Sequence, residues 1–144
     1  MYVPDYFRMD DIPIIKEFIR NHDLATVVSR SIDRPLAAHL MVELDDSEEG
    51  LFKLRGHMSK ENPIWESFDD TSDILAISQG AHTYISPTWY EKPAPPTWNS
   101  MSVHVYGKPA ILTDRNDLRG VLDRLVTRHE VYVVKWFRTQ SVVF

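Results

Sequence analysis

The chain has 144 residues, a length that commonly forms one domain, and 43% of its residues are hydrophobic. This composition supplies enough apolar surface for a core that needs no disulfide or metal to support it. Because the sequence contains no cysteine, disulfides, thiolate metal sites, iron–sulfur clusters and cysteine nucleophiles are excluded. The net charge of −5 disfavours general attraction to nucleic acid or to anionic membranes.

Segments that direct a protein to or across a membrane have recognisable patterns, and the sequence shows none of them. The N-terminus lacks the basic region and apolar run of a secretory signal. No apolar run approaches the roughly 20 residues that a spanning helix needs. We therefore expect a cytoplasmic protein with no membrane partner.

Hydrophobic periodicity predicts the elements of the N-terminal half. Asp10 or Asp11 can cap a first helix, which we expect to end near residues 21–23. A β-branched run predicts a strand over 24–29. Alternation of apolar and polar residues predicts a second strand over 35–44, and an acidic loop then leads into a returning strand over 51–58.

The C-terminal half is predicted to contain two helices and three strands. The helices cover 62–68 and 114–128, and the strands cover 73–79, 82–86 and 101–106. Four prolines between residues 87 and 99 exclude a central strand there and predict a loop. Five or six short strands with about three helices indicate a mainly β protein, a small antiparallel, Greek-key-like β-barrel decorated by helices.

No sequence motif predicts catalysis or metal binding. Four histidines lie on predicted strands, namely His39, His57, His82 and His104. A metal site needs three or four converging ligands, and neither an HExxH pair nor a similar spacing occurs. The chain also lacks a GxSxG elbow, a Walker loop and a dinucleotide fingerprint. We therefore assign no catalytic residue and no metal ligand.

Two segments suggest ligand binding. Ser59 and Lys60 end a strand just before the helix that Asn62 is expected to cap, which suits a phosphate, although the spacing taken alone favours an ordinary strand-to-helix turn with a solvated lysine. Residues 84–99 hold four large aromatic side chains in a loop stiffened by prolines. These aromatics could bind a planar ring or a partner subunit, or could anchor the loop over an apolar patch; a proline-rich peptide ligand is a further alternative.

Six segments, taken in order, make the chain resemble a known family. They are 1–4 (MYVP), 25–29 (ATVVS), 35–40 (PLAAHL), 56–65 (GHMSKENPIW), 79–90 (QGAHTYISPTWY) and 96–107 (PTWNSMSVHVYG). Each is weak alone, whereas the ordered set is specific. The chain resembles the PaiB family of FMN-binding negative transcriptional regulators, within the FMN-binding split-barrel superfamily.

The resemblance implies a split β-barrel that forms a homodimer and holds FMN at the subunit interface. It places Ser59 and Lys60 at the FMN phosphate and His39 beside the isoalloxazine ring. The cofactor-binding residues that it implies are His39, His57, Ser59, Lys60, Asn62, Thr97, Trp98 and Asn99. The family domain is expected over residues 1–130, followed by an atypical apolar tail over 131–144.

The resemblance also implies a regulator that acts through DNA or a regulatory protein partner, without enzymatic activity. The negative charge and the absence of a helix-turn-helix pair argue against direct DNA binding. The alternative is an FMN-dependent oxidoreductase or a haem-binding or haem-degrading enzyme of the same superfamily, in which the cofactor would supply the chemistry.

Overall fold

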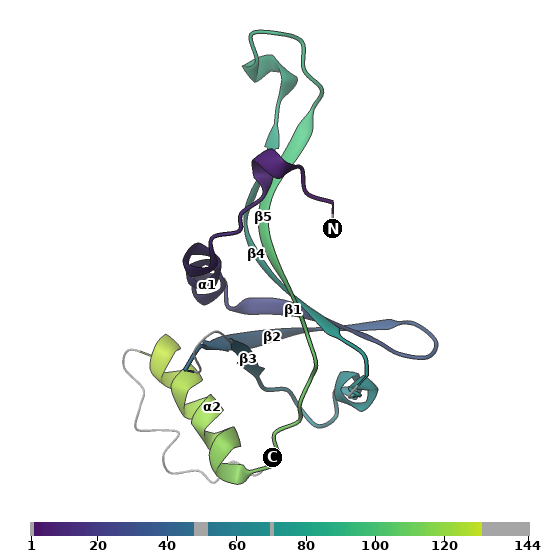
Figure 1. The fold of residues 1–144 in the computed structure, drawn as a ribbon, viewed down its shortest axis with the longest axis vertical. Coiled ribbons are helices and arrows are strands. Elements are labelled where there is room, and N and C mark those ends of the chain that lie inside the picture. Colours follow the sequence, from purple (N-terminus) through teal and green to yellow (C-terminus); the bar gives the residue numbers. More distant parts are fainter. Residues whose placement is uncertain (1, 48–51, 70, 131–144) are drawn as a thin grey trace.

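A computed structural model describes residues 2–47, 52–69 and 71–130, which form one antiparallel sheet with short helices around it (Figure 1). The strands are β1 (Leu24–Arg30), β2 (Pro35–Asp45), β3 (Lys53–Gly56), β4 (Ile74–Ile85) and β5 (Thr97–Gly107). The α-helices are α1 (Ile12–Asn21) and α2 (Arg115–His129), and the 3-10 helices are η1 (Asp5–Phe7), η2 (Pro63–Ser67) and η3 (Pro87–Trp89).

The strand order, β3-β2-β1-β4-β5, is that of a Greek key with one strand added. The chain forms the meander β1 to β3, then crosses back so that β4 pairs with β1, giving the spatial order 4-1-2-3. The predicted mainly β, antiparallel fold is confirmed. In the described residues the sheet does not close on itself, as a split barrel allows.

One face of the sheet, which we call the covered face, holds the core. Ile64 of η2 is 1% exposed and packs with Val27 of β1 and Ala76 of β4. Partly buried apolar side chains surround them: Leu36, Ala38, Leu40, Leu54, Met58, Phe68, Ile74 and Val105. The turn after β3 therefore brings η2 under the sheet, and burial of this apolar surface is the main stabilising contribution.

Both α-helices begin as the sequence predicted. The Asp11 carboxylate accepts a hydrogen bond from the amide of Ile14 at 3.1 Å, and Asp114 caps α2 in the same way. Ion pairs tie α2 to the body, with Arg124 on Glu43 of β2 at 2.7 Å, and with Arg128 and His129 on Asp23. Within the described ranges, no helix has the length and apolar character needed to cross a membrane.

The predicted break between two strands at Gly80 is wrong, because β4 runs unbroken from Ile74 to Ile85. A register shift between Gln79 and His82 marks a β-bulge, and Gly80 leaves room there for α1. A Cβ at Gly80 would lie 2.7 Å from the Phe18 ring, so a side chain would collide with the helix.

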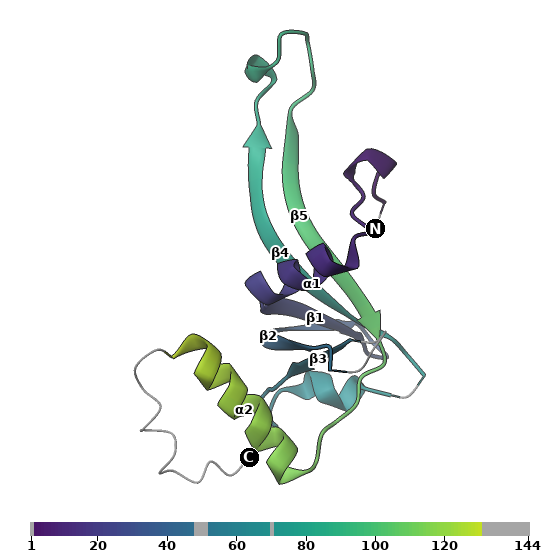
Figure 2. The same ribbon diagram turned by 60° about the vertical axis from the view of Figure 1, so that its left-hand side comes forward.

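The strand predicted over 101–106 begins earlier in the structure, because β5 starts at Thr97. Thr97 pairs with Ile85, the last residue of β4. We call the resulting two-stranded extension, residues 81–100, the arm. Figures 1 and 2 show it standing away from the sheet, with η3 near its tip. The prolines before Thr97 exclude a strand only as far as that residue, which is why the loop was predicted too long.

The predicted returning strand over 51–58 is also longer than β3, which ends at Gly56. The helix predicted over 62–68 is the 3-10 helix η2, capped by Asn62. The predicted tail over 131–144 lies outside the described residues.

Candidate functional site

The second face of the sheet, which we call the open face, presents side chains none of which is buried. Strand register places four of them in one row across β2, β1, β4 and β5, namely His39, Thr26, Ile77 and His104. Directly paired residues point to the same face of a sheet, so this row is continuous. A neighbouring row consists of Ala37, Val28, Leu75 and Tyr106.

The open face ends in a hollow beside the turn between β1 and β2, which we call the turn groove. It has a volume of about 500 Å³. Its apolar floor comes from Val28 and Leu75, and Tyr106 of β5 forms one wall. Arg30 and Arg34 approach from the two ends of the turn. The groove is a surface hollow that is largely open to solvent.

Of the charged side chains around the turn groove, some have an ion-pair partner and others have none. Asp73 pairs with Lys108 at 3.0 Å, which neutralises that carboxylate. Among residues 2–47, 52–69 and 71–130, no ion pair or hydrogen bond engages the guanidinium of Arg30 or of Arg34. Asp33 lies between the two arginines in the same turn and offsets one of the two positive charges.

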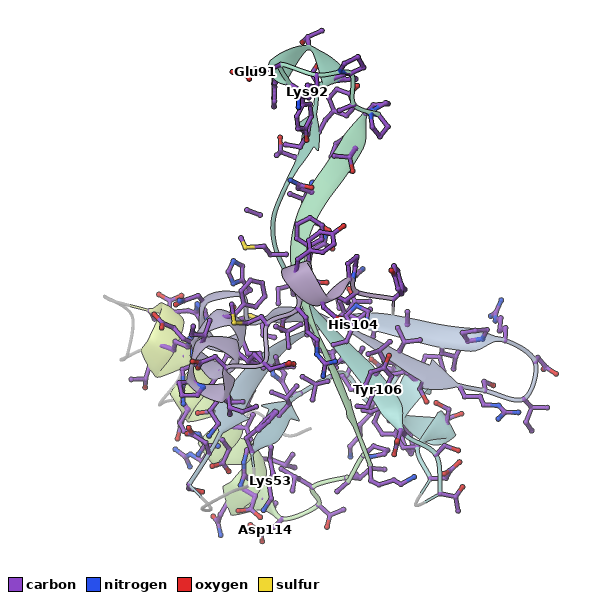
Figure 3. All side chains as sticks on the ribbon, turned by 45° about the horizontal axis from the view of Figure 1, so that its top comes forward. Lys53, Glu91, Lys92, His104, Tyr106 and Asp114 are labelled. Carbon is purple, nitrogen blue, oxygen red and sulfur yellow. The ribbon has the colours of Figure 1, made fainter. Side chains whose placement is uncertain are left out.

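His104 is the most unusual polar group on the open face. Its Nδ1 atom is buried and has no hydrogen-bond partner within the described part of the chain. A buried polar atom without a partner costs about 1–3 kcal/mol, so this atom needs an explanation, and a water or a ligand that completes it is one. At the opposite end of the row, His39 Nδ1 lies 3.1 Å from the Thr26 hydroxyl. Figure 3 shows His104 and Tyr106 following one another along β5.

Several polar groups of the turn predicted to hold a phosphate make internal hydrogen bonds, although within the described residues no hydrogen bond or ion pair engages the Lys60 ammonium. The Ser59 hydroxyl donates to the Glu61 carboxylate at 2.6 Å, and the Lys60 carbonyl accepts from the Trp65 indole at 2.9 Å. The Asn62 side chain accepts from the amide of Ile64 at 3.1 Å, which occupies a donor that a phosphate would need. The Glu61 carboxylate would repel a phosphate, so this turn suits an anion poorly.

The arm holds the other predicted residues, and its two faces separate them. Trp98 pairs with Tyr84, and its indole donates a hydrogen bond to His82 Nδ1 at 3.2 Å. Side chains alternate along a strand, so Thr97 and Asn99 point to the opposite face of the arm from Trp98. One flat ligand on the arm could therefore contact Trp98 or its two neighbours, but not all three side chains.

The structure thus distributes the predicted residues over three places within one subunit. His39 lies on the open face, the segment from His57 to Asn62 leads into η2 below the covered face, and Thr97 to Asn99 lie on the arm. It adds residues that the sequence-based site lacked: Arg30, Arg34, His104 and Tyr106. The alternation of Ser102, His104 and Tyr106 was the available signal, since it places the last two on one strand face.

Metal binding finds no support in the geometry. No three His, Asp or Glu side chains gather into a possible metal site anywhere in residues 2–47, 52–69 or 71–130. The partly buried Asp23 lies 2.9 Å from His129, and this pair joins α2 to the segment between α1 and β1.

Comparison with protein families gives the relationship directly. A family model described as Putative FMN-binding domain matches residues 1–141. The chain belongs to this family. The predicted resemblance to PaiB is confirmed by a 33% identical match over 130 residues to "Protease synthase and sporulation protein PAI 2" of Bacillus subtilis (strain 168), covering 90% of this chain and 62% of that protein.

Two fungal proteins are also similar. "Uncharacterized protein YKL070W" of Saccharomyces cerevisiae is 31% identical over 100 residues, covering 65% of this chain and 59% of that protein. "Uncharacterized protein AN0679" of Emericella nidulans is 25% identical over 174 residues, covering 94% of this chain and 69% of that protein. The chain thus spans about three fifths of the length of the bacterial and yeast relatives.

Proposed function

We propose that this protein binds FMN on the open face of its sheet and acts as a cytoplasmic regulator, not as an enzyme. Its membership of an FMN-binding domain family supports the choice of ligand. The observation that carries the location is the buried, unpartnered Nδ1 of His104, a half-buried residue at one end of the row that crosses the open face.

The residues of the open face fit a flavin. Thr26 and Ile77 form the middle of the row, and Val28 and Leu75 extend it as a flat apolar surface. His39 and His104 lie at opposite ends of that surface, and a ring nitrogen of either one could hydrogen-bond the polar edge of an isoalloxazine. When bound, FMN supplies a planar, redox-active ring, while these side chains bind, orient and shield it.

We further propose a homodimer in which the arm contacts the second subunit. No residue of the arm is buried, and Trp98 and Trp89 are 61% and 68% exposed. An isolated two-stranded ribbon is marginally stable in water, so a surface that covers this one would stabilise it. The hydrogen bond from Trp98 to His82 holds the indole in place before any partner binds.

A regulatory role is favoured by the bacterial relative, whose name concerns protease synthesis and sporulation. We propose that a protein partner is more important than direct DNA contact. On α2, the guanidiniums of Arg124, Arg128 and Arg119 pair with Glu43, Asp23 and Asp123. This helix therefore offers little free positive charge to a phosphate backbone.

The test is to incubate the purified protein with FMN, remove unbound ligand by desalting, and record the flavin absorption together with the mass by light scattering. We expect bound flavin near one per chain and the mass of a dimer. Trp98→Ala should shift the mass towards the monomer at low concentration, whereas Trp65→Ala, away from the arm, should not. A protein that emerges without flavin would refute FMN binding, and a monomeric wild type would refute the dimer.

A further inference from the structure

We infer that His82 is a pH-sensitive switch in the arm: protonation of its imidazole releases Trp98 and weakens the pairing of two subunits. The effect on pairing rests on the proposed homodimer. Strand register places His82 opposite Ser100 and Tyr84 opposite Trp98, so these four side chains share one face of the arm. We call this the aromatic face of the arm, which stands away from the sheet in Figure 2.

The contact between His82 and Trp98 determines which ring nitrogen of the imidazole carries the proton. An indole N–H can only donate, so His82 Nδ1, which lies 3.2 Å from the indole nitrogen, accepts and carries no proton. The proton of the neutral ring therefore lies on Nε2. An imidazole gains its second proton between about pH 5 and 8. In His82 that proton would lie on Nδ1 and face the indole N–H, and two donors cannot form a hydrogen bond with each other.

The hydrogen bond is the polar contact that orients the Trp98 indole. The Trp98 ring lies between His82 and Tyr84, with ring centroids 5.7 Å and 6.3 Å away. Among the described residues, no second hydrogen bond engages the indole N–H. Protonation of His82 therefore leaves the indole with ring contacts alone, and it brings a positive charge to the positive edge of the indole.

The surroundings of His82 supply no negative charge to offset this proton. The Tyr84 phenol shares its face, and α1 brings His22 to the base of the arm, where His22 Nε2 would lie 3.1 Å from a Cβ at Gly80. Neither group is an acid that is ionised near neutral pH. Across residues 2–47, 52–69 and 71–130, no carboxylate forms an ion pair or a hydrogen bond with His82.

The same proton opposes burial of the aromatic face. Trp98 is 61% exposed and Tyr84 is 46% exposed, so a second subunit can cover much of this surface. Covering it would remove His82 from water, which disfavours the charged form of an imidazole. Pairing should therefore weaken as the pH falls. The net charge of −5 predicts the opposite trend, because acid lowers the repulsion between two negative chains. The direction of the pH effect thus separates the switch from general electrostatics.

The first experiment follows the hydrogen bond itself and does not require a dimer. The full chain has four tryptophans, and the indole signal of Trp98 in a ¹H–¹⁵N NMR spectrum is the one lost in Trp98→Phe. We expect this signal to shift together with the His82 ring signals between about pH 8 and 6. His82→Asn keeps an acceptor but cannot titrate in this range, so its Trp98 signal should stay constant.

The matched control is His129→Asn, which removes an imidazole from α2, on a different part of the molecule from the arm (Figure 1). It should leave the titration of the Trp98 signal unchanged. A Trp98 signal that does not change with pH in the wild type, or that changes equally in His82→Asn, would overturn the inference.

The second experiment measures pairing by sedimentation equilibrium at the same two pH values. We expect the dissociation constant of the wild-type dimer to rise about fivefold from pH 8 to 6, and that of His82→Asn to change less than about twofold. Equal or tighter pairing at pH 6 would leave the dimer standing and overturn the inference. A wild type that is monomeric at both pH values would refute the proposed dimer and the effect on pairing, whereas a titrating Trp98 signal would still support control of Trp98 by His82.

Discussion

The two faces of the same sheet differ in what their side chains contact. On the covered face, Val27 and Ala76 pack against Ile64 and are nearly inaccessible to solvent. On the open face, their neighbours in sequence, Thr26 and Ile77, are only partly buried and lie between two histidines. A single strand therefore presents alternately core side chains and solvent-accessible side chains, because its side chains point to opposite faces.

This difference explains where substitutions should act. A change on the covered face removes contacts that hold the fold together, and its effect on ligand affinity should be indirect. A change on the open face removes little buried surface, so its main effect should appear in flavin binding. Stability and flavin affinity, measured on the same variants, should therefore separate the two faces.

The largest effect is expected for the side chain at the centre of the core. Ile64→Ala should lower the free energy of unfolding by about 3 kcal/mol, because it leaves a cavity between η2 and the sheet. Ile77→Ala, the matched change on the open face, should cost about 1 kcal/mol but weaken FMN binding several-fold. Urea unfolding and flavin titration of both variants measure the two effects. Equal stability losses would contradict the distinction between the faces.

The next effect concerns the contact of α1 with the sheet at the bulge of β4. Gly80→Ala should destabilise the protein by about 1–2 kcal/mol, because the new methyl group would lie 2.7 Å from the Phe18 ring. Gly107→Ala is the control, since a Cβ there would meet nothing within 4 Å. Thermal unfolding should show a lower midpoint for the first variant only, and a stable Gly80→Ala would mean that α1 does not pack there.

A smaller effect is expected where α2 is joined to the sheet. Arg124→Ala removes an ion pair with Glu43 in which the arginine side chain is 49% exposed. Exposed pairs contribute little, so the loss should be about 0.5 kcal/mol and should shrink as salt is added. Denaturant unfolding at low and high salt measures it. A loss that is large and independent of salt would indicate that α2 is held mainly by this residue.

The smallest effect should appear only in acid. Hydrogen bonds from Thr71 and Ser72 to the carboxylate lower the pKa of Asp69 to about 2, from an ordinary value of 3.8. The group binds protons more readily in the unfolded chain, so its stabilising contribution is present above pH 3.8 and is lost as the pH falls towards about 2. Asp69→Asn should therefore be less stable than wild type near neutral pH, with the difference narrowing in that window. Unfolding curves from pH 2 to 6 measure it, and a difference that does not change with pH would contradict it.

Much of the fold could be predicted because its signals are local. The carboxylates of Asp11 and Asp114 cap α1 and α2 where the sequence indicated, and alternation predicted β2 closely. The continuity of β4 could not be predicted, because a glycine such as Gly80 indicates the end of a strand in sequence. In the structure, Gly80 instead leaves room for α1. Its role depends on a contact with a residue far away in the sequence.

The candidate site was less predictable for the same reason. His39 was expected near the ligand because of the family resemblance, and the structure puts it on the open face. In the sequence, Arg30 and Arg34 are two cations in a turn and belong to no recognisable motif. Pairing of β1 with β4, and of β4 with β5, shows that this turn adjoins Leu75 and Tyr106. The phosphate site predicted at Ser59 and Lys60 stays a prediction, and the structure adds that the Ser59 hydroxyl donates to the Glu61 carboxylate.

An NMR experiment on the protein with FMN bound distinguishes the two faces of the sheet. Nuclear Overhauser effects between the ring methyl protons of FMN and protein methyl groups report which face the ring contacts. The account predicts signals to Ile77, Val28 and Leu75 of the open face and none to Ile64 or Leu54 of the covered face. Signals confined to the covered face, or to residues near Ser59 and Lys60, would contradict it.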